Sequence, residues 1–230
     1  MPLPQTYEPH QQTYQCYQCF QCHQKQLELD AGSSAPLIGV PTGIKDIFYT
    51  AGVPTTACSK VCADFVPEHD ATTVARLKAA GGIMFGKTVT TEFAYRDPSP
   101  TRNPWNLDHT PGGSSSGSAA AVAAMMCPTA FGTQTRGSVL RPASYNGIVG
   151  LKPTFGRVSR FGVVPLSWSF DHVGWMARSV EDVALVLQVM AGPDTNDPTT
   201  VYDEVPDYCV AIKNPGPPHV GVLQDYFFEN

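Results

Sequence analysis

The most restrictive feature of this sequence is the stretch between Asp108 and Arg136, which contains no Asp, Glu, Lys or Arg. A stretch without charges belongs either in a membrane or in the interior of a folded protein. Pro111, Pro128 and the Gly/Ser-rich segment 112–118 interrupt it. It therefore fails the requirement of roughly 20 consecutive apolar residues for a membrane helix. The stretch predicts a buried loop, helix and strand inside a globular protein.

Size and charge narrow the class of protein further. A chain of 230 residues corresponds to one or two domains, at about 100–200 residues per domain. Its net charge of −5 provides no basic surface, which argues against a nucleic acid or an anionic membrane as the main partner. The first ten residues have neither the basic nor the apolar region of a secretion signal. Seven cysteines, an odd number in a chain this long, are typical of a reducing compartment. We expect a cytoplasmic protein.

Residues 1–35 differ in composition from the rest and predict a poorly ordered, Gln/Cys-rich leader of low complexity. Cys16, Cys19 and Cys22 recur every three residues, and His23 follows. The pattern matches a haem-attachment motif or part of a metal or cluster site. Haem attachment normally requires export, and the remaining cysteines form no second C-x-x-C pair that would close a zinc site. We interpret these cysteines as thiols without a metal or haem.

From Pro36 onward, strand-like and helix-like segments alternate. This alternation predicts an α/β fold, with a β-sheet covered by helices on both faces. Asp70 is the expected N-cap of the first helix, Ser179 opens a capping box, and Gly192 follows the last helix. The first expected strand is formed by residues 37–40 and 42–44 together and leads to Lys45. The other expected strands are 83–85, 129–132 and 220–223, and the expected helices are 71–80, 116–126 and 180–190.

Two Gly/Ser loops flank the uncharged helix and strand, at residues 112–118 and 132–138. The helix climbs about 16 Å and the strand returns about 16 Å. Both loops therefore lie at the same edge of the sheet, where open α/β sheets place their sites. Ser114 and Ser138 can meet there. Lys45 can join them, because it also ends a predicted strand.

A serine needs a base before it can act as a nucleophile. The six histidines are poorly placed for that task, which leaves a lysine. Lys45 follows an apolar strand, and desolvation costing about 4 kcal/mol would lower its pKa enough to make it neutral. The backbone N–H groups of Thr135, Arg136 and Gly137 are candidates for an oxyanion hole.

Four segments, at residues 39–46, 112–118, 132–144 and 150–154, together resemble the amidase signature family, and the resemblance extends from about residue 36 to residue 192. It implies a mixed α/β sheet and hydrolysis of a carboxylic amide through a serine acyl-enzyme, without metal or cofactor. The implied substrate is a small-molecule amide.

The resemblance also implies roles for three residues. Ser138 would be the nucleophile, Ser114 the bridging serine with a cis peptide bond, and Lys45 the general base. Two positions depart from the family pattern. Arg136 stands where the family has Gly or Ala, and Leu140 stands where many members have an arginine, with Arg141 one position later.

The family's catalytic domains are longer than this chain. We therefore expect residues 36–192 to form the catalytic core and residues 193–230 to form a Pro-rich linker with the start of a truncated C-terminal portion. Sheet edges that the absent portion leaves open favour association with further copies of the chain.

Alternative functions stay open. The motif at residues 113–117 also fits the G-x-S-x-G nucleophile elbow of an esterase, with Ser115 as nucleophile. The same loop resembles a phosphate cradle, although the Gly-Lys-Ser/Thr ending is missing. An inert, truncated amidase homologue is another reading. The last is a glutamyl-tRNA amidotransferase component of the A type.

Overall fold

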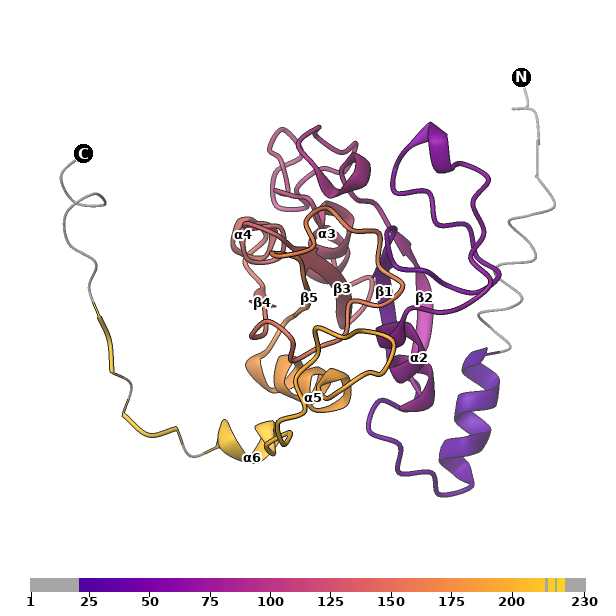
Figure 1. The fold of residues 1–230 in the computed structure, drawn as a ribbon, viewed down its shortest axis with the longest axis vertical. Coiled ribbons are helices and arrows are strands. Elements are labelled where there is room, and N and C mark those ends of the chain that lie inside the picture. Colours follow the sequence, from indigo (N-terminus) through magenta and orange to yellow (C-terminus); the bar gives the residue numbers. More distant parts are fainter. Residues whose placement is uncertain (1–20, 214, 218, 222–230) are drawn as a thin grey trace.

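A five-stranded sheet occupies the centre of the computed structural model, which describes residues 21–213, 215–217 and 219–221 (Figure 1). The strand order is β2-β1-β3-β5-β4. Strand β1 runs parallel to β2 and β3, and β5 runs antiparallel to β3 and β4. The predicted mixed sheet is confirmed. The strands are β1 (Pro41–Lys45), β2 (Ile83–Thr88), β3 (Thr129–Gln134), β4 (Val149–Leu151) and β5 (His172–Ala177).

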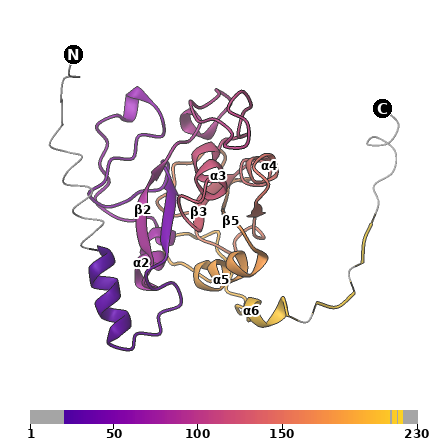
Figure 2. The same cartoon turned by 180° about the vertical axis from the view of Figure 1, so that it is seen from behind.

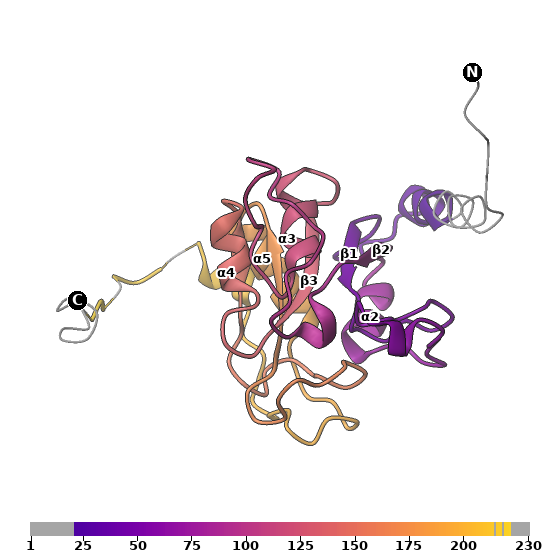
Figure 3. The same cartoon turned by 90° about the horizontal axis from the view of Figure 1, so that it is seen from above.

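Helices cover both faces of this sheet, as the sequence predicts. In Figures 1 and 2, α3 and α4 lie in the upper half of the molecule and α2 and α5 in the lower half. Viewed from above, residues 215–217 and 219–221 lie away from the sheet (Figure 3). The helices are α2 (Thr72–Ala79), α3 (Ser116–Ala123), α4 (Leu140–Tyr145), α5 (Val180–Met190) and α6 (Tyr208–Ala211), with short 3-10 helices η1 (Lys60–Cys62) and η2 (Glu92–Ala94).

Two separate apolar cores account for this arrangement. Side chains of α2 and α5 pack with Trp175 in one core, and side chains of α3 and α4 pack with Met176 in the other. Trp175 and Met176 are consecutive in β5, where successive side chains point to opposite faces. Both are fully buried, and the indole N–H of Trp175 donates to the carbonyl of Val183 at 3.0 Å. The alternation within β5 therefore divides the interior into two layers.

The helix boundaries follow the sequence signals in one case and depart from them in two. Ser179 caps α5 by accepting from the N–H of Asp182 at 3.1 Å, as predicted. Asp70 does not cap α2, because its carboxylate instead accepts from the N–H of Ala51 and pairs with Lys78. Helix α3 ends at Ala123 and not at residue 126, because Met125 has a φ of 59°.

The first half of the first expected strand, residues 37–40, was wrong. The N–H of Val40 donates to the carbonyl of Leu37, which makes this segment a turn. Glycine suits it, because Gly39 has a φ of 73°. The strand begins only at Pro41, and the second half of the expected strand, residues 42–44, is the middle of β1.

Residues 21–30 form a helix, where a poorly ordered leader was expected. It carries Cys22, which is exposed, and His23. The other two cysteines of the motif, Cys16 and Cys19, lie outside the described residues, as does part of the strand expected at residues 220–223. Among the described residues, no helix combines the length and the apolar character needed to cross a bilayer.

The start of α3 packs closely against the chain after β2, and this contact fixes the preceding Gly/Ser loop. The N–H of Gly117 donates to the carbonyl of Val89 at 2.9 Å. A Cβ added at residue 117 would lie 2.9 Å from that same carbonyl oxygen and still closer to the amide nitrogen of Val89. The contact therefore requires glycine.

We predict that Gly117→Ala lowers the free energy of unfolding by about 1–3 kcal/mol, because an added methyl overpacks a backbone contact. Gly86→Ala is the matched control, since a Cβ at residue 86 meets no atom within 4 Å. We expect that control to change stability by less than about 0.5 kcal/mol. Urea denaturation of both variants measures the difference. Equal stabilities would contradict the close packing.

Candidate active site

Lys45 is the last residue of β1 and is completely buried, with 0% of its surface exposed. Its Nζ donates to Ser114 Oγ and to Thr133 Oγ1, both at 2.8 Å. Ile44 and Ile47, also buried, flank it in the sequence. The strand thus places the Lys45 amine at the edge of the sheet where β1 ends, in an apolar environment in which two hydroxyl groups are its hydrogen-bond partners.

Burial lowers the pKa of Lys45 to about 7, and the negative charge of Asp171 opposes part of that shift. A buried amine loses favourable hydration only in its charged form, so desolvation favours the neutral form. Near neutral pH, a substantial fraction of Lys45 therefore carries a free lone pair. Such a group can accept a proton, which an exposed lysine at this pH cannot.

The loop before α3 presents Ser114 to Lys45. The Gly113–Ser114 peptide bond is cis, as the resemblance implied, and Ser114 is 1% exposed. Arg141 holds this loop, because its Nε and Nη2 donate to the carbonyl of Gly113 at 3.2 and 2.6 Å. On the other side, the N–H of Thr91 donates to the carbonyl of Ser114 at 3.2 Å. Contacts from two distant segments thus fix the loop.

The two Gly/Ser loops meet at the sheet edge, as their lengths predict. The N–H of Ser115 donates to the carbonyl of Ser138 at 3.2 Å. Ser138 is half-buried and lines a polar cleft of about 630 Å³, which Gly113 and Gly137 also line. Within the described residues, the hydroxyl of Ser138 makes no hydrogen bond to Ser114. The structure thus brings the two loops together without joining the two hydroxyls.

The turn at residues 135–138 keeps its N–H groups available. Gln134 Oε1 accepts from the N–H groups of Val139 and Leu140, both at 2.9 Å, which fixes the start of α4. The N–H groups of Arg136 and Gly137 meet no acceptor within the part of the chain that the structure describes. The Arg136 side chain is exposed, so it does not fill the turn.

Three residues of the site were missed by the sequence analysis. Thr133 bonds Lys45 directly, Gln134 braces the turn, and Asp171 sets part of the Lys45 environment. Asp171 accepts from Thr135 Oγ1 at 2.5 Å. A signal existed for Thr133, because a polar residue at the end of an otherwise apolar uncharged strand needs a partner. No sequence signal singles out Asp171.

The esterase alternative loses its geometric basis. Ser115 is fully buried, and its Oγ donates to the carbonyl of Thr133 while accepting from the same residue's N–H, both at 3.3 Å. Residues 104–109 form turns, a bend and one isolated bridge residue, where a nucleophile elbow requires a strand. Among the described residues, no group of three His, Cys, Asp or Glu side chains could hold a metal ion.

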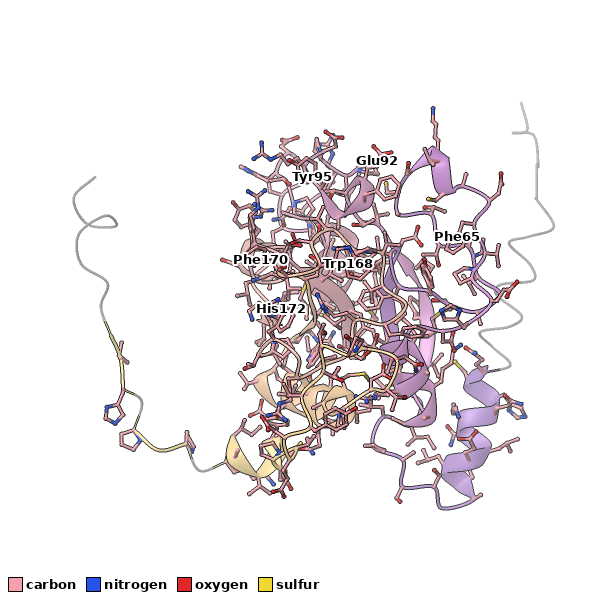
Figure 4. The ribbon with its side chains drawn as sticks, viewed as in Figure 1. Phe65, Glu92, Tyr95, Trp168, Phe170 and His172 are labelled. Carbon is pink, nitrogen blue, oxygen red and sulfur yellow. The ribbon has the colours of Figure 1, made fainter. Side chains whose placement is uncertain are left out.

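A second, mostly apolar cavity of about 250 Å³ adjoins the polar cleft. Ala94 and Leu166 line both spaces, and Thr133 connects the apolar cavity to the partners of Lys45. Figure 4 shows Trp168 on the same face as Tyr95, and Trp168 also lines this cavity. The site thus has a polar compartment beside Ser138 and an apolar compartment next to it.

A completely buried lysine is thus hydrogen-bonded to a loop serine at the edge of a mixed α/β sheet. The sequence profile of the amidase family matches residues 6–230. The chain belongs to this family.

Relatives with assigned names agree with that membership. The A-type component of glutamyl-tRNA(Gln) amidotransferase from Desulfatibacillum aliphaticivorans is 50% identical over 206 residues, which cover 86% of this chain and 42% of the relative. The corresponding protein of Roseiflexus sp. (strain RS-1) is 50% identical over 204 residues, with the same coverage. The chain thus spans less than half the length of these relatives.

Solved structures show the same fold. The native peptide amidase of Stenotrophomonas maltophilia superposes with a TM-score of 0.79 at 42% identity, over 84% of this chain and 42% of that one. The A-type component of glutamyl-tRNA(Gln) amidotransferase from Thermotoga maritima gives a TM-score of 0.71 at 44% identity, over 73% of this chain and 38% of that one.

The lowered pKa of Lys45 predicts a pH-dependent stability. The folded chain releases this proton near pH 7, while the unfolded chain holds it until about pH 10.4. Between these values the unfolded state binds more protons, so the free energy of unfolding rises with pH. Relative to Lys45→Met, the wild type should gain stability, on the order of 4 kcal/mol, from pH 7 to pH 10. Urea denaturation across this range measures it, and a pH-independent difference would refute a neutral Lys45.

Proposed function

We propose that this chain is an amidase that hydrolyses a carboxylic, non-peptide amide through a serine acyl-enzyme. Ser138 is the nucleophile, Ser114 the bridging serine and Lys45 the general base. The observation that carries the proposal is the completely buried Lys45, with its pKa near 7 and its Nζ 2.8 Å from Ser114 Oγ. A structural lysine at a strand end gains nothing from such burial, because desolvation destabilises its charged form.

The reaction follows from these positions. Ser138 Oγ forms a bond to the carbonyl carbon while its proton passes to Ser114, whose own proton passes to Lys45. Collapse of the tetrahedral intermediate breaks the carbon–nitrogen bond, and the proton returns to the leaving amine. Water then attacks the acyl-enzyme with the same groups as base, which releases the carboxylic acid and restores Ser138.

The oxyanion of both intermediates is assigned to the turn after β3. We infer that the backbone N–H groups of Thr135, Arg136 and Gly137 donate to it. The free N–H groups of Arg136 and Gly137 support this role, as does the brace that Gln134 gives to the turn. Fixed donors at a developing negative charge are among the largest contributions to acyl transfer.

The substrate, setting and assembly belong to the same proposal. The substrate is a small-molecule amide, and the protein works in the cytoplasm without metal or cofactor. Strands β2 and β4 are the edges of the described sheet, and they are the surfaces through which further copies of the chain would associate. The functional units are the core at residues 36–192 and the segments on either side of it.

A second candidate function is that of the glutamine-hydrolysing component of a glutamyl-tRNA(Gln) amidotransferase. The 50% identity to proteins of that name favours it. Against it stands the composition of the polar cleft, whose lining contains no Asp or Glu to bind the α-ammonium group of glutamine. An inert amidase homologue is the reading that remains if neither activity is found.

A serine-directed fluorophosphonate tests the triad. We expect the intact mass of the wild type to increase by one adduct and Ser138→Ala to remain unlabelled. Lys45→Ala should react at least about a hundredfold more slowly, which is the usual contribution of a general base. Ser144→Ala is the control, because Ser144 is exposed on α4, and it should react like the wild type. Labelling of Ser138→Ala would refute the nucleophile, and an unlabelled but folded wild type would favour the inert homologue.

Glutamine and glutaric acid monoamide differ only in the α-ammonium group and separate the two candidate functions. We expect kcat/KM for ammonia release to be higher with glutaric acid monoamide, because no carboxylate lines the cleft to bind the ammonium group. A preference for glutamine of about tenfold or more, equivalent to one charged hydrogen bond, would favour the amidotransferase function instead.

A further inference from the structure

The cleft that contains Ser138 carries positive charge without a counterion. Its lining includes Arg96, Arg136 and Arg141, and it contains no Asp or Glu. The ion pairs of the described residues all involve lysines, and none involves an arginine. This positive cleft lies in a protein whose net charge is −5, so the local charge opposes that of the whole chain.

The three arginines of the cleft are not equivalent. Arg141 donates twice to the carbonyl of Gly113, so its guanidinium is committed to the loop. Arg96 lies over the ring of Tyr95, with its guanidinium carbon 5.8 Å from the ring centre. Arg136 is exposed, and its guanidinium makes no hydrogen bond or ion pair within the described residues. Arg136 therefore retains its full capacity to bind a ligand.

Most other arginines of the chain do have hydrogen-bond partners within the described residues. Each of four arginines outside the polar cleft donates to backbone carbonyls: Arg76, Arg157, Arg160 and Arg178. Arg102 is exposed, like Arg136, but it does not line the cleft. Within the part of the chain that the structure describes, two guanidinium groups without hydrogen-bond partners thus lie in the concave space beside Ser138.

The position of Arg136 sets how far a bound group lies from the reacting atoms. It stands two residues before Ser138, so their Cα atoms are at most about 7 Å apart. A guanidinium binds a carboxylate through two parallel hydrogen bonds, and a cleft lined by one sign of charge raises the local concentration of the opposite ion. A substrate with an anionic group a few bonds from its scissile carbonyl places the anion at Arg136 when the carbonyl is at Ser138.

We propose that Arg136, assisted by Arg96, binds a carboxylate of the substrate, so that this amidase acts on amides that also carry a negative charge. The proposal rests on the proposed function and names its substrate class. Figure 4 shows Tyr95, which supports Arg96, at the upper edge of the face that also carries Trp168. The charged end of the substrate thus occupies the polar cleft, and its apolar part faces the adjoining cavity.

Succinic acid monoamide and butyramide test the proposal, because they differ only in a carboxylate against a methyl group. The readout is the ratio of their kcat/KM values. Any disturbance of the turn by a substitution acts on both amides and cancels in this ratio. We expect the wild type to prefer the monoamide at least about tenfold. Arg136→Gln should remove most of that preference, Arg96→Gln part of it, and Arg136→Lys should retain part of it through its charge.

Arg102→Gln is the matched control and should keep the wild-type ratio. The preference should also fall as NaCl is raised, because exposed charges are screened. A ratio near one in the wild type, or a ratio unchanged by Arg136→Gln, would overturn the inference while leaving the amidase proposal intact. If neither amide is hydrolysed, the amidase proposal fails, and calorimetric titration with succinate decides the inference. Binding of succinate that Arg136→Gln weakens supports the anion site, and absence of binding overturns it.

Discussion

The burial of one amine organises the site. Lys45 ends β1 with no exposed surface, and its only polar partners among the described side chains are the hydroxyls of Ser114 and Thr133. Desolvation lowers its pKa to about 7. Two contacts hold the loop that carries Ser114. Arg141 holds the carbonyl of Gly113, and close packing of Gly117 against the chain after β2 fixes the start of α3.

Division of the interior into two apolar layers explains how so uncharged a segment folds. Helix α3 and strand β3 have no charged side chains, and the sheet that contains β3 separates α3 from α2 and α5. The polar side chains that would be costly to bury without hydrogen bonds lie at one edge of the sheet, where hydroxyl and backbone groups form hydrogen bonds with them. The polar cleft at this edge and the apolar cavity beside it share Ala94 and Leu166. The same edge thus combines Ser138, Lys45 and two chemically distinct cavities.

Sequence patterns predicted β1, β2 and β3, helices α2, α3 and α5, and the meeting of the Gly/Ser loops, because burial and chain length dictate these features. Strands β4 and β5 and helix α4 were not among the expected elements. The patterns did not predict that Asp171 influences Lys45 or that Arg141 holds the loop at Gly113, since both residues act through contacts that only the folded chain creates. The expected cap at Asp70 failed for the same reason, because a tertiary ion pair with Lys78 recruits that carboxylate. The helix at residues 21–30 was missed because its few apolar residues have no clear period.

The ionisation of Lys45 is the central claim, and a titration of the lysine side chains by NMR measures it most directly. In protein labelled at the lysine ε-carbon, one resonance should titrate near pH 7 and be absent from Lys45→Met. A second, from Lys87, should titrate near pH 8, because burial also lowers the pKa of that residue to about 8. If the resonance assigned to Lys45 titrates near pH 10, like a hydrated amine, Lys45 is charged at neutral pH and cannot serve as the base.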